Sequence, residues 1–323
     1  MGSMEYILKF IKVIESIEQD NTYKVAFARA ILECIELEEY EQQGDDYVIY
    51  QYNLVQKVIK YYWNQIAFFN LSQGPSSILE ARILEIEEEF YQHTAVTYPV
   101  WYDKVETFLK RNPIRFERQV KKFITIFNKG VASKFKASRY DKLELYELDT
   151  KFKLIRFTND QLKSLKEYGD LLNQVIDYKW SRLLEEYNKA PNIIRKVVGS
   201  KDDKIKRQNL LKHRNLLLQY YHLEGVKDFY TGELIEVDNI SMEHVLPFNF
   251  IYGCDIWNLI IVSKETAAKH RGMIPTEKDI EQLNKRNEIL FNAIQDTKLQ
   301  ARFELENAIE NHLIKRYYID LIG

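Results

Sequence analysis

Cysteine is scarce in this chain, which has only Cys34 and Cys254 among 323 residues. The two lie far apart in the sequence, so they offer neither a zinc-ligand spacing nor a disulfide framework. Such low cysteine usage fits a reducing compartment, and we therefore expect a cytoplasmic protein. Cys34 shares a helical spacing with Phe27, Ala30 and Ile31, which predicts a place in a helical core.

Long apolar runs are missing as well, since no stretch approaches the roughly 18 residues that a membrane-spanning helix needs. A secretory leader is not expected, because Lys9, Lys12, Glu15 and Glu18 interrupt residues 4–19. The composition, 46% hydrophobic and 29% charged, is that of a globular protein. The length leaves room for two or three domains of about 100–200 residues each.

No charge of one sign dominates, because the net charge is only −2, but the charges are unevenly spread. Residues up to 95 include 16 acidic and 7 basic ones, whereas residues 110–142 include 11 basic and 2 acidic ones. Residues 195–214 include 8 basic and 2 acidic ones. Near-neutrality of the whole chain therefore conceals two basic segments, which a phosphate-binding surface would need.

Three regions follow from these patterns. Residues 4–95 carry apolar residues at helical spacing and predict an acidic helical domain for scaffolding, dimerisation or partner binding. Residues 96–200 predict a basic helical region whose charges suit either a solvated face or contact with DNA. Within it, Leu145 to Phe157 predict a small hairpin, and Leu162 to Tyr187 predict one long helix. Residues 201–323 form the third region.

Strand and helix signals alternate in the third region. Ile240–Val245 is short, partly β-branched and alternating, which predicts a strand. The apolar run Ile256–Val262 predicts a second strand. Ser263 is a good N-cap for a helix that begins at Lys264. The order is therefore strand, loop, strand, helix.

Glu243 and His244 combine two chemical roles at the end of the first strand. Glu243 offers a hard oxygen ligand that suits Mg²⁺ or Mn²⁺. The imidazole of His244 has a pKa near the working pH, which suits a general base. Phosphodiester hydrolysis needs both, a cation for the charge on the phosphate and a base for the water. A Glu-His pair alone is more often an ordinary surface pair, so the surrounding pattern decides.

That pattern resembles the HNH (ββα-metal) endonuclease family. The matching residues, in order, are Glu243-His244, Pro247, Asn258-Leu259, Pro275, Leu283 and Arg286-Asn287. The resemblance implies that Glu243 binds the metal, His244 activates water, and Asn258 holds the motif loop and the histidine together. It also implies one divalent ion, Mg²⁺ or Mn²⁺, and DNA as the substrate.

Two positions depart from the family. Many members carry a Cys-x-x-Cys zinc pair where this chain has Phe229-Tyr230-Thr231-Gly232, so no structural zinc is expected. The family's helix ligand would fall near Thr266 or Ala267, and neither is a good metal ligand. His270 lies about one helical turn later and could replace it, because residues three or four apart share a helix face. Otherwise the site is weakened or inactive.

Basic residues near the motif are candidates for contacts with backbone phosphates. Residues 201–222 are expected to form a helix that leads into the motif. The expected nucleic-acid-binding residues are Lys204, Lys206, Arg207, Lys212 and Arg214 on that helix, with Lys269 and Arg271 at the end of the motif helix.

The sequence thus predicts a mainly α fold with a small ββα-metal HNH unit near the C-terminus. The expected function is metal-dependent endonucleolytic hydrolysis of DNA, and the resemblance suggests a setting in restriction or antiviral (anti-phage) defence. Two alternatives stay open: a catalytically impaired HNH-fold module that binds nucleic acid, and an effector regulated by a partner. The expected partners are DNA and either a second copy or a co-encoded protein on the N-terminal helices, with no membrane. A double-strand cut from one site per chain would need a dimer or two visits.

Overall fold

The computed structural model describes residues 2–17, 22–75, 77–136, 144–206, 208–221 and 224–323, and these are mainly helical, as the sequence predicts. They group into two compact units. The first, which we call the N-terminal unit, comprises Met1–Val96, Val100–Asn188 and Ile193–Ile205. The second, the C-terminal unit, comprises Thr97–Pro99, Lys189–Asn192 and Lys206–Gly323.

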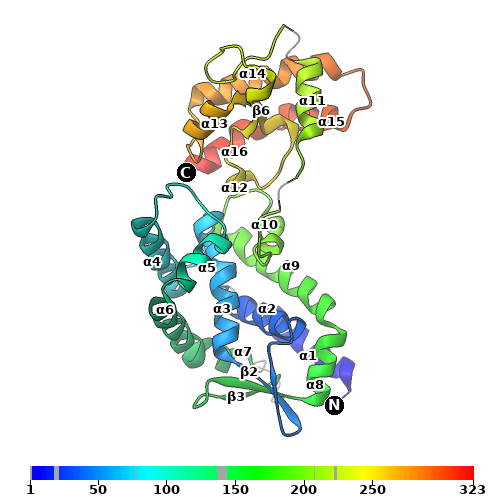
Figure 1. Cartoon of the computed structure of the whole chain (residues 1–323). Helices are drawn as coiled ribbons and strands as arrows, with labels where there is room; N and C mark the ends of the chain where they lie inside the picture. The colour runs from blue at the N-terminus through cyan, green and yellow to red at the C-terminus, as the bar shows by residue number, and fades with distance from the viewer. Residues whose placement is uncertain (1, 18–21, 76, 137–143, 207, 222–223) are drawn as a thin grey trace. The chain divides into compact units, whose positions relative to one another are not determined.

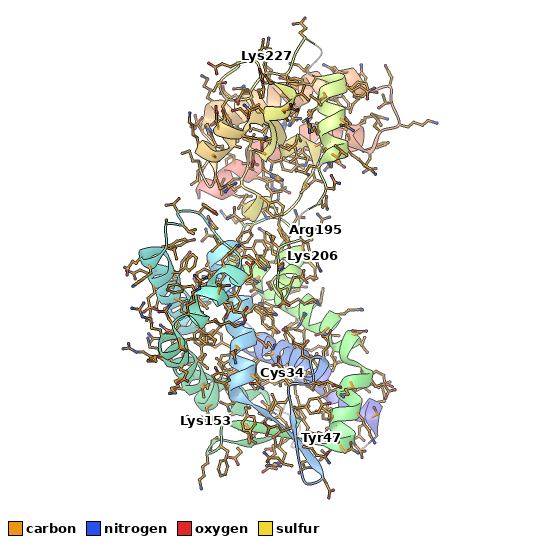
Figure 2. The ribbon with its side chains drawn as sticks, in the orientation of Figure 1. Cys34, Tyr47, Lys153, Arg195, Lys206 and Lys227 are labelled. Carbon is orange, nitrogen blue, oxygen red and sulfur yellow. The ribbon has the colours of Figure 1, made fainter. Side chains whose placement is uncertain are left out.

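The N-terminal unit is built around a buried helix, α2, which packs against α3 and α9. Cys34 lies on α2 and is fully buried with Phe27, Ala30 and Ile31, which confirms the predicted core position (Figure 2). The helices, shown in Figure 1, are α1 (Ser3–Glu15), α2 (Tyr23–Glu36), α3 (Gln51–Tyr62), α4 (Ile78–His93), α5 (Tyr102–Lys110), α6 (Pro113–Ile126), α7 (Ala132–Phe135), α8 (Asn159–Glu167), α9 (Gly169–Tyr187) and α10 (Ile193–Gly199), with π-helical turns η1 (Trp63–Phe68) and η2 (Phe127–Val131).

A four-stranded sheet joins residues 4–95 to residues 96–200 within this unit. Its strands are β1 (Glu41–Gln43), β2 (Asp46–Tyr50), β3 (Glu147–Asp149) and β4 (Leu154–Thr158), in the order β1-β2-β4-β3. β2 and β4 pair antiparallel, and β3 and β4 form the hairpin that the sequence predicts. The two regions expected to be separate therefore share one sheet and one core. Such pairing between distant segments leaves no local periodicity in the sequence.

Two predicted helices differ from the structure. The expected helix from Leu162 to Tyr187 is divided at Tyr168, where the backbone leaves the helical conformation just before Gly169. Glycine is among the weakest helix formers, which favours a break there. The expected helix over residues 201–222 begins only at Leu211, since the charged stretch before it has no apolar stripe to pack.

The C-terminal unit places a two-stranded antiparallel sheet among helices. β5 and β6 pair from Ile240 opposite Ser263 to His244 opposite Leu259, and α13 packs on both strands. The elements are α11 (Leu211–Tyr220), η3 (Val237–Asn239), β5 (Ile240–His244), α12 (Phe248–Ile251), η4 (Ile256–Asn258), β6 (Leu259–Ser263), α13 (Lys264–His270), α14 (Glu277–Ile294), α15 (Gln300–Glu310) and α16 (Leu313–Ile322).

The predicted local signals of this unit are largely confirmed. The first strand lies where expected, and the second begins at Leu259 because Ile256–Asn258 form a 3₁₀ turn. The Ser263 side chain accepts a hydrogen bond from the backbone N–H of Thr266 and so caps α13. Within the described ranges, none of the helices combines the length and the apolar character needed to cross a bilayer.

Burial of Lys196 on α10 makes the stability of the protein depend on pH. It is fully buried, and its ammonium lies 5.8 Å from the ring centre of Phe69. Burial lowers the pKa of Lys196 from 10.5 to about 7. Between these two values the unfolded chain holds a proton that the folded chain has lost, so the free energy of unfolding rises with pH in that window.

We expect Lys196→Met to raise the free energy of unfolding at pH 7 by about 1–3 kcal/mol and to flatten this pH dependence. Urea denaturation followed by tryptophan fluorescence between pH 7 and 10 checks both effects. Lys163→Met on the exposed face of α8 is the matched control and should change neither quantity. An unchanged pH slope in Lys196→Met would contradict the prediction.

Candidate functional site

The end of β5 presents the Glu-His pair. Glu243 lies opposite Ile260 and His244 lies opposite Leu259 in the strand register. Adjacent residues within a strand point to opposite faces, and His244 is the last residue of β5, where this alternation ends and the chain enters the loop. Both are half-buried, and the Ser241 hydroxyl donates to the Glu243 carboxylate over 3.1 Å.

Asn258 fixes the loop that follows His244. It is fully buried, and its amide nitrogen donates to the carbonyl of Leu246 over 2.9 Å. Its amide oxygen accepts from the backbone N–H of Leu246 over 2.8 Å. The backbone N–H of Val245 donates to the Asn258 carbonyl over 3.1 Å. One side chain thus satisfies both polar backbone groups of a buried residue, and the loop contact implied for Asn258 is present.

At the position where the HNH resemblance implies a helix ligand, α13 carries Thr266 and Ala267. Thr266 and Ala267 are 7% and 9% exposed. The Thr266 hydroxyl lies 2.9 Å from the Ser263 hydroxyl and is used in capping. Both residues lie on the helix that packs on the strand pair. The expected ligand position is therefore filled by side chains that cap the helix or pack against the strands.

His270, at the end of α13, is held in one orientation. Its Nδ1 lies 3.0 Å from the carbonyl oxygen of Thr266. A carbonyl only accepts, so Nδ1 carries the proton in the neutral ring and Nε2 keeps a lone pair. The ring stacks on Tyr230, with centroids 4.0 Å apart and planes 3° apart. A backbone partner on one nitrogen is how ligand histidines are commonly oriented.

Tyr230 interacts with both residues that are expected to bind the metal. Burial raises the pKa of the Tyr230 hydroxyl, and the carboxylates of Asp279, Glu243 and Asp228 raise it further. Glu243 is therefore near enough to act on the ring that stacks on His270. Glu243 and His270 thus both interact with Tyr230, Glu243 through its charge and His270 through ring stacking.

Asp228 is the residue that sequence reasoning missed. It is 3% exposed, and one carboxylate oxygen accepts from the backbone N–H groups of Tyr230 (3.0 Å) and Thr231 (3.2 Å). The other accepts from the N–H of Ser263 over 2.8 Å. Burial raises the pKa of Asp228, but hydrogen bonds from Ser263, Thr266, Thr231 and Tyr230 outweigh burial and lower it. An Asp before a Tyr-Thr-Gly turn is an Asx-turn signal that could have identified it.

The downstream residues Arg286 and Asn287 have structural roles. The Arg286 guanidinium donates to the carbonyls of Ile256 (3.1 and 3.2 Å), Leu259 (2.6 Å) and Trp257 (3.4 Å). The Asn287 amide donates to Trp257 over 2.9 Å. Together they attach α14 to the segment that leads into β6, and burial lowers the pKa of Arg286 to about 9.

A divalent ion at this site would have few protein ligands. Among the described residues, no three His, Cys, Asp or Glu side chains gather as a metal-binding group. The two expected ligands are the carboxylate of Glu243 and the imidazole of His270. Mg²⁺ and Mn²⁺ often keep several waters and take the rest of their ligands from substrate phosphate, so two protein donors are sufficient for such an ion.

The predicted phosphate-contacting residues do not share one element. Lys204 belongs to the N-terminal unit, whereas Lys206 belongs to the C-terminal unit, and neither is in a helix. Lys212 is exposed on α11, and Arg214 on the same helix donates to the Val237 carbonyl. Arg207 lies outside the described residues.

Two more of these residues lie at the end of α13. Lys269 and Arg271 are both exposed, and the Arg271 guanidinium lies 5.3 Å from the ring centre of Tyr98. Together with Lys206 and Lys212 they are the exposed cations of the C-terminal unit among the residues expected to bind nucleic acid.

The basic helix α6 of the N-terminal unit is partly neutralised. Lys122 forms an ion pair with Glu85 of the acidic helix α4 over 3.0 Å, and Lys121 pairs with Glu117 over 3.3 Å. In the same basic segment, Lys136 pairs with Glu144. The basic excess that the sequence assigns to residues 110–142 is therefore reduced at the surface of the folded unit.

Replacing Asp228 tests how far this carboxylate holds the site together. In Asp228→Asn, the amide NH₂ would face a backbone N–H group that donates to the carboxylate in the wild type. We therefore expect the free energy of unfolding of the C-terminal unit to fall by about 2–4 kcal/mol. Because the folded pKa is lowered, the native contribution is present above the ordinary Asp pKa and is lost as pH falls through the lowered value.

Hydrogen exchange at the β6 amides, compared at pH 7 and pH 3.5, checks this prediction. Wild type should be far better protected than Asp228→Asn at pH 7, and the difference should shrink at the lower pH. Asp238→Asn, on the exposed turn η3, is the matched control. Equal protection of β6 in wild type and Asp228→Asn at pH 7 would show that the carboxylate is dispensable.

Comparison with known proteins identifies a family for the N-terminal part of the chain. No curated protein matches the sequence, and no solved structure matches it. One family, described as "Domain of unknown function (DUF8808)", matches residues 7–198. This range ends before the strand pair and α13 and covers more than half of the 323 residues. The chain therefore belongs to the DUF8808 family.

Proposed function

We propose that the C-terminal unit is an HNH-type endonuclease that hydrolyses phosphodiester bonds in DNA with the help of a divalent ion. The observation that carries the proposal is the Asn258 clamp on Leu246. It fixes the chain immediately after Glu243-His244 against β6, as a nuclease loop of this kind requires. The order strand, clamped loop, strand and helix supports the same proposal.

His244 is the proposed general base. Its ring lies 5.2 Å from the ring of Phe248, and its Nε2 is enclosed by protein atoms. The base would take a proton from water as the oxygen attacks phosphorus, and it would be positioned by the loop that Asn258 holds.

Glu243 and Nε2 of His270 are the proposed protein ligands for Mg²⁺ or Mn²⁺. When bound, the ion would offset the negative charge that develops on the phosphate. Tyr230 holds the ring of His270 by stacking, and the Thr266 carbonyl fixes its tautomer. Lys269, Arg271 and Lys212 are proposed to contact backbone phosphates, and a setting in restriction or anti-phage defence remains part of the proposal.

A second candidate is a catalytically impaired module that binds nucleic acid. Thr266 and Ala267 favour it, because the expected ligand position on α13 is filled by two buried side chains that suit capping and packing. The two candidates differ in metal binding and in cleavage, so each of the following measurements separates them.

Cleavage of a supercoiled plasmid tests the first candidate. We expect Mn²⁺-dependent nicking or cutting by wild type, and a loss of at least 100-fold in rate for His244→Ala, as is typical when a general base is removed. His93→Ala, an exposed histidine of the N-terminal unit, is the matched control and should cleave as wild type does. Cleavage by His244→Ala at the wild-type rate would exclude this residue as the base.

Metal binding is the independent readout. We expect low-millimolar Mn²⁺ to raise the melting temperature of wild type by about 2–5 °C, through preferential binding to the folded state. Glu243→Gln and His270→Ala should each abolish this rise, whereas Glu265→Gln on the exposed face of α13 should keep it. No rise in wild type, together with its appearance in Ala267→Asn, would favour the impaired module.

A further inference from the structure

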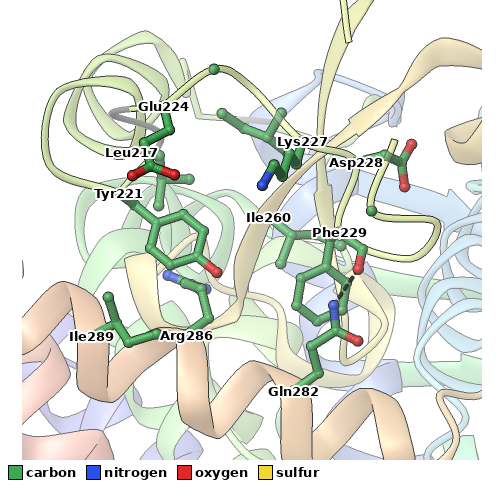
Figure 3. Close-up of a pocket in the computed structure, with 13 residues that line it drawn as sticks. Leu217, Tyr221, Glu224, Lys227, Asp228, Phe229, Ile260, Gln282, Arg286 and Ile289 are labelled. Carbon is green, nitrogen blue, oxygen red and sulfur yellow. Dashed lines mark hydrogen bonds between the residues drawn. The ribbon is translucent and has the colours of Figure 1, made fainter. Parts of the chain in front are cut away.

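The C-terminal unit contains a cavity of about 460 Å³. It lies between α11, α14, β6 and the segment of residues 224–232 (Figure 3). Its volume is within the range of about 300–1,000 Å³ that is usual for small-molecule sites. It is separate from the side chains assigned above to metal binding and catalysis, because neither Glu243, His244 nor His270 lines it.

Most of the cavity wall is apolar and aromatic. Leu217 from α11, Ile260 from β6 and Ile289 from α14 contribute aliphatic side chains. The rings of Tyr221 and Phe229 stand on two sides of the space in Figure 3. A flat ring system could lie between such walls, because aromatic side chains favour stacked or edge-on contacts.

The inner wall carries a buried charge without an acidic partner. Arg286 lines the cavity and is 2% exposed. Its terminal nitrogens donate only to backbone carbonyls, and no carboxylate among the described residues forms an ion pair with it. Its Nε is buried and has no hydrogen-bond partner among the described residues. A buried charge of this kind is strongly unfavourable unless an anion compensates it.

The other charged residues that line the cavity are Lys227, Asp228 and Glu224. The Lys227 side chain points between Tyr221 and Ile260 in Figure 3. The neighbouring Asp228 has both carboxylate oxygens engaged by backbone N–H groups, so it contributes little free negative charge to the cavity. Glu224 is exposed at the same segment and marks the solvent side.

We infer that this cavity binds a small anion with a flat ring body, with the ring between Tyr221 and Phe229 and the acidic group toward Arg286 and Lys227. A nucleoside monophosphate and an aromatic carboxylate share this chemistry. The inference does not depend on the proposed nuclease activity. A bound ligand would also stabilise the C-terminal unit. Phe229 in the cavity wall is hydrogen-bonded to Ile261 of β6 and to Gln282 of α14, so contacts with the ligand would reinforce a segment that joins both elements.

Isothermal titration of the full chain tests the inference. The probes are the four ribonucleoside 5′-monophosphates, indole-3-acetate as the aromatic carboxylate, and adenosine as a neutral ring. We expect saturable binding by at least one of the two anion classes, and adenosine at least ten-fold weaker than the monophosphate. Binding confined to one class identifies the source of the ligand. Failure of both classes to saturate at millimolar concentration, or equal binding of adenosine, would overturn the inference.

Substitutions locate the binding. Ile289→Trp adds bulk at the cavity wall without touching Arg286, and it should weaken binding by ten-fold or more, which corresponds to about 1.4 kcal/mol. Ile319→Trp on α16 is the matched control, since the two isoleucines are 46% and 52% exposed and only Ile289 lines the cavity. Lys227→Gln should weaken the anions several-fold and leave adenosine unchanged. Wild-type affinity in Ile289→Trp would place the binding elsewhere and overturn the inference.

Discussion

The C-terminal unit depends on the hydrogen bonds that the Asp228 carboxylate accepts. It accepts hydrogen bonds from the backbone of Tyr230 and Thr231 in the turn and from Ser263 at the end of β6. Three segments therefore meet at one buried, ionised group: the turn, the second strand and the first turn of α13. Several charge-assisted hydrogen bonds to one side chain thus hold the turn in place. Tyr230, whose ring orients His270, is positioned as a result.

The rest of the candidate site follows the same physical rule, that buried backbone groups must be paired. Asn258 pairs both groups of Leu246, and Arg286 serves the carbonyls of Ile256, Trp257 and Leu259. These contacts allow an irregular loop to run through the interior beside His244. Arg286 satisfies the carbonyls but brings a charge that no carboxylate of the described residues balances, and from this we infer that the adjacent cavity prefers an anion. The same residue thus links the stability of the unit to a separate binding surface.

Much of this unit could be predicted because its signals are local. Alternation in Ile240–Val245, the apolar run that ends at Val262 and the cap at Ser263 each act within a few residues of the chain. Asn258 could be named only through the resemblance, since nothing local shows that its amide reaches Leu246. The helix expected over residues 201–222 begins only at Leu211, because the residues before it have no apolar face to pack and helix propensity alone does not hold a short helix. Asp228 was missed because its partner Ser263 lies 35 residues away.

The sequence by itself determined the mainly helical class and the two strands of the C-terminal unit, because periodicity and capping are local. It also contains the residue types on which the proposed hydrolysis depends. Only the tertiary structure decided which distant groups meet. It paired β2 with β4 and so combined two regions of different charge in one unit. It stacked Tyr230 on His270 and enclosed Arg286 beside a cavity lined by four separate segments. Such contacts depend on how buried faces match in space, and the order of residues along the chain carries no signal of that match.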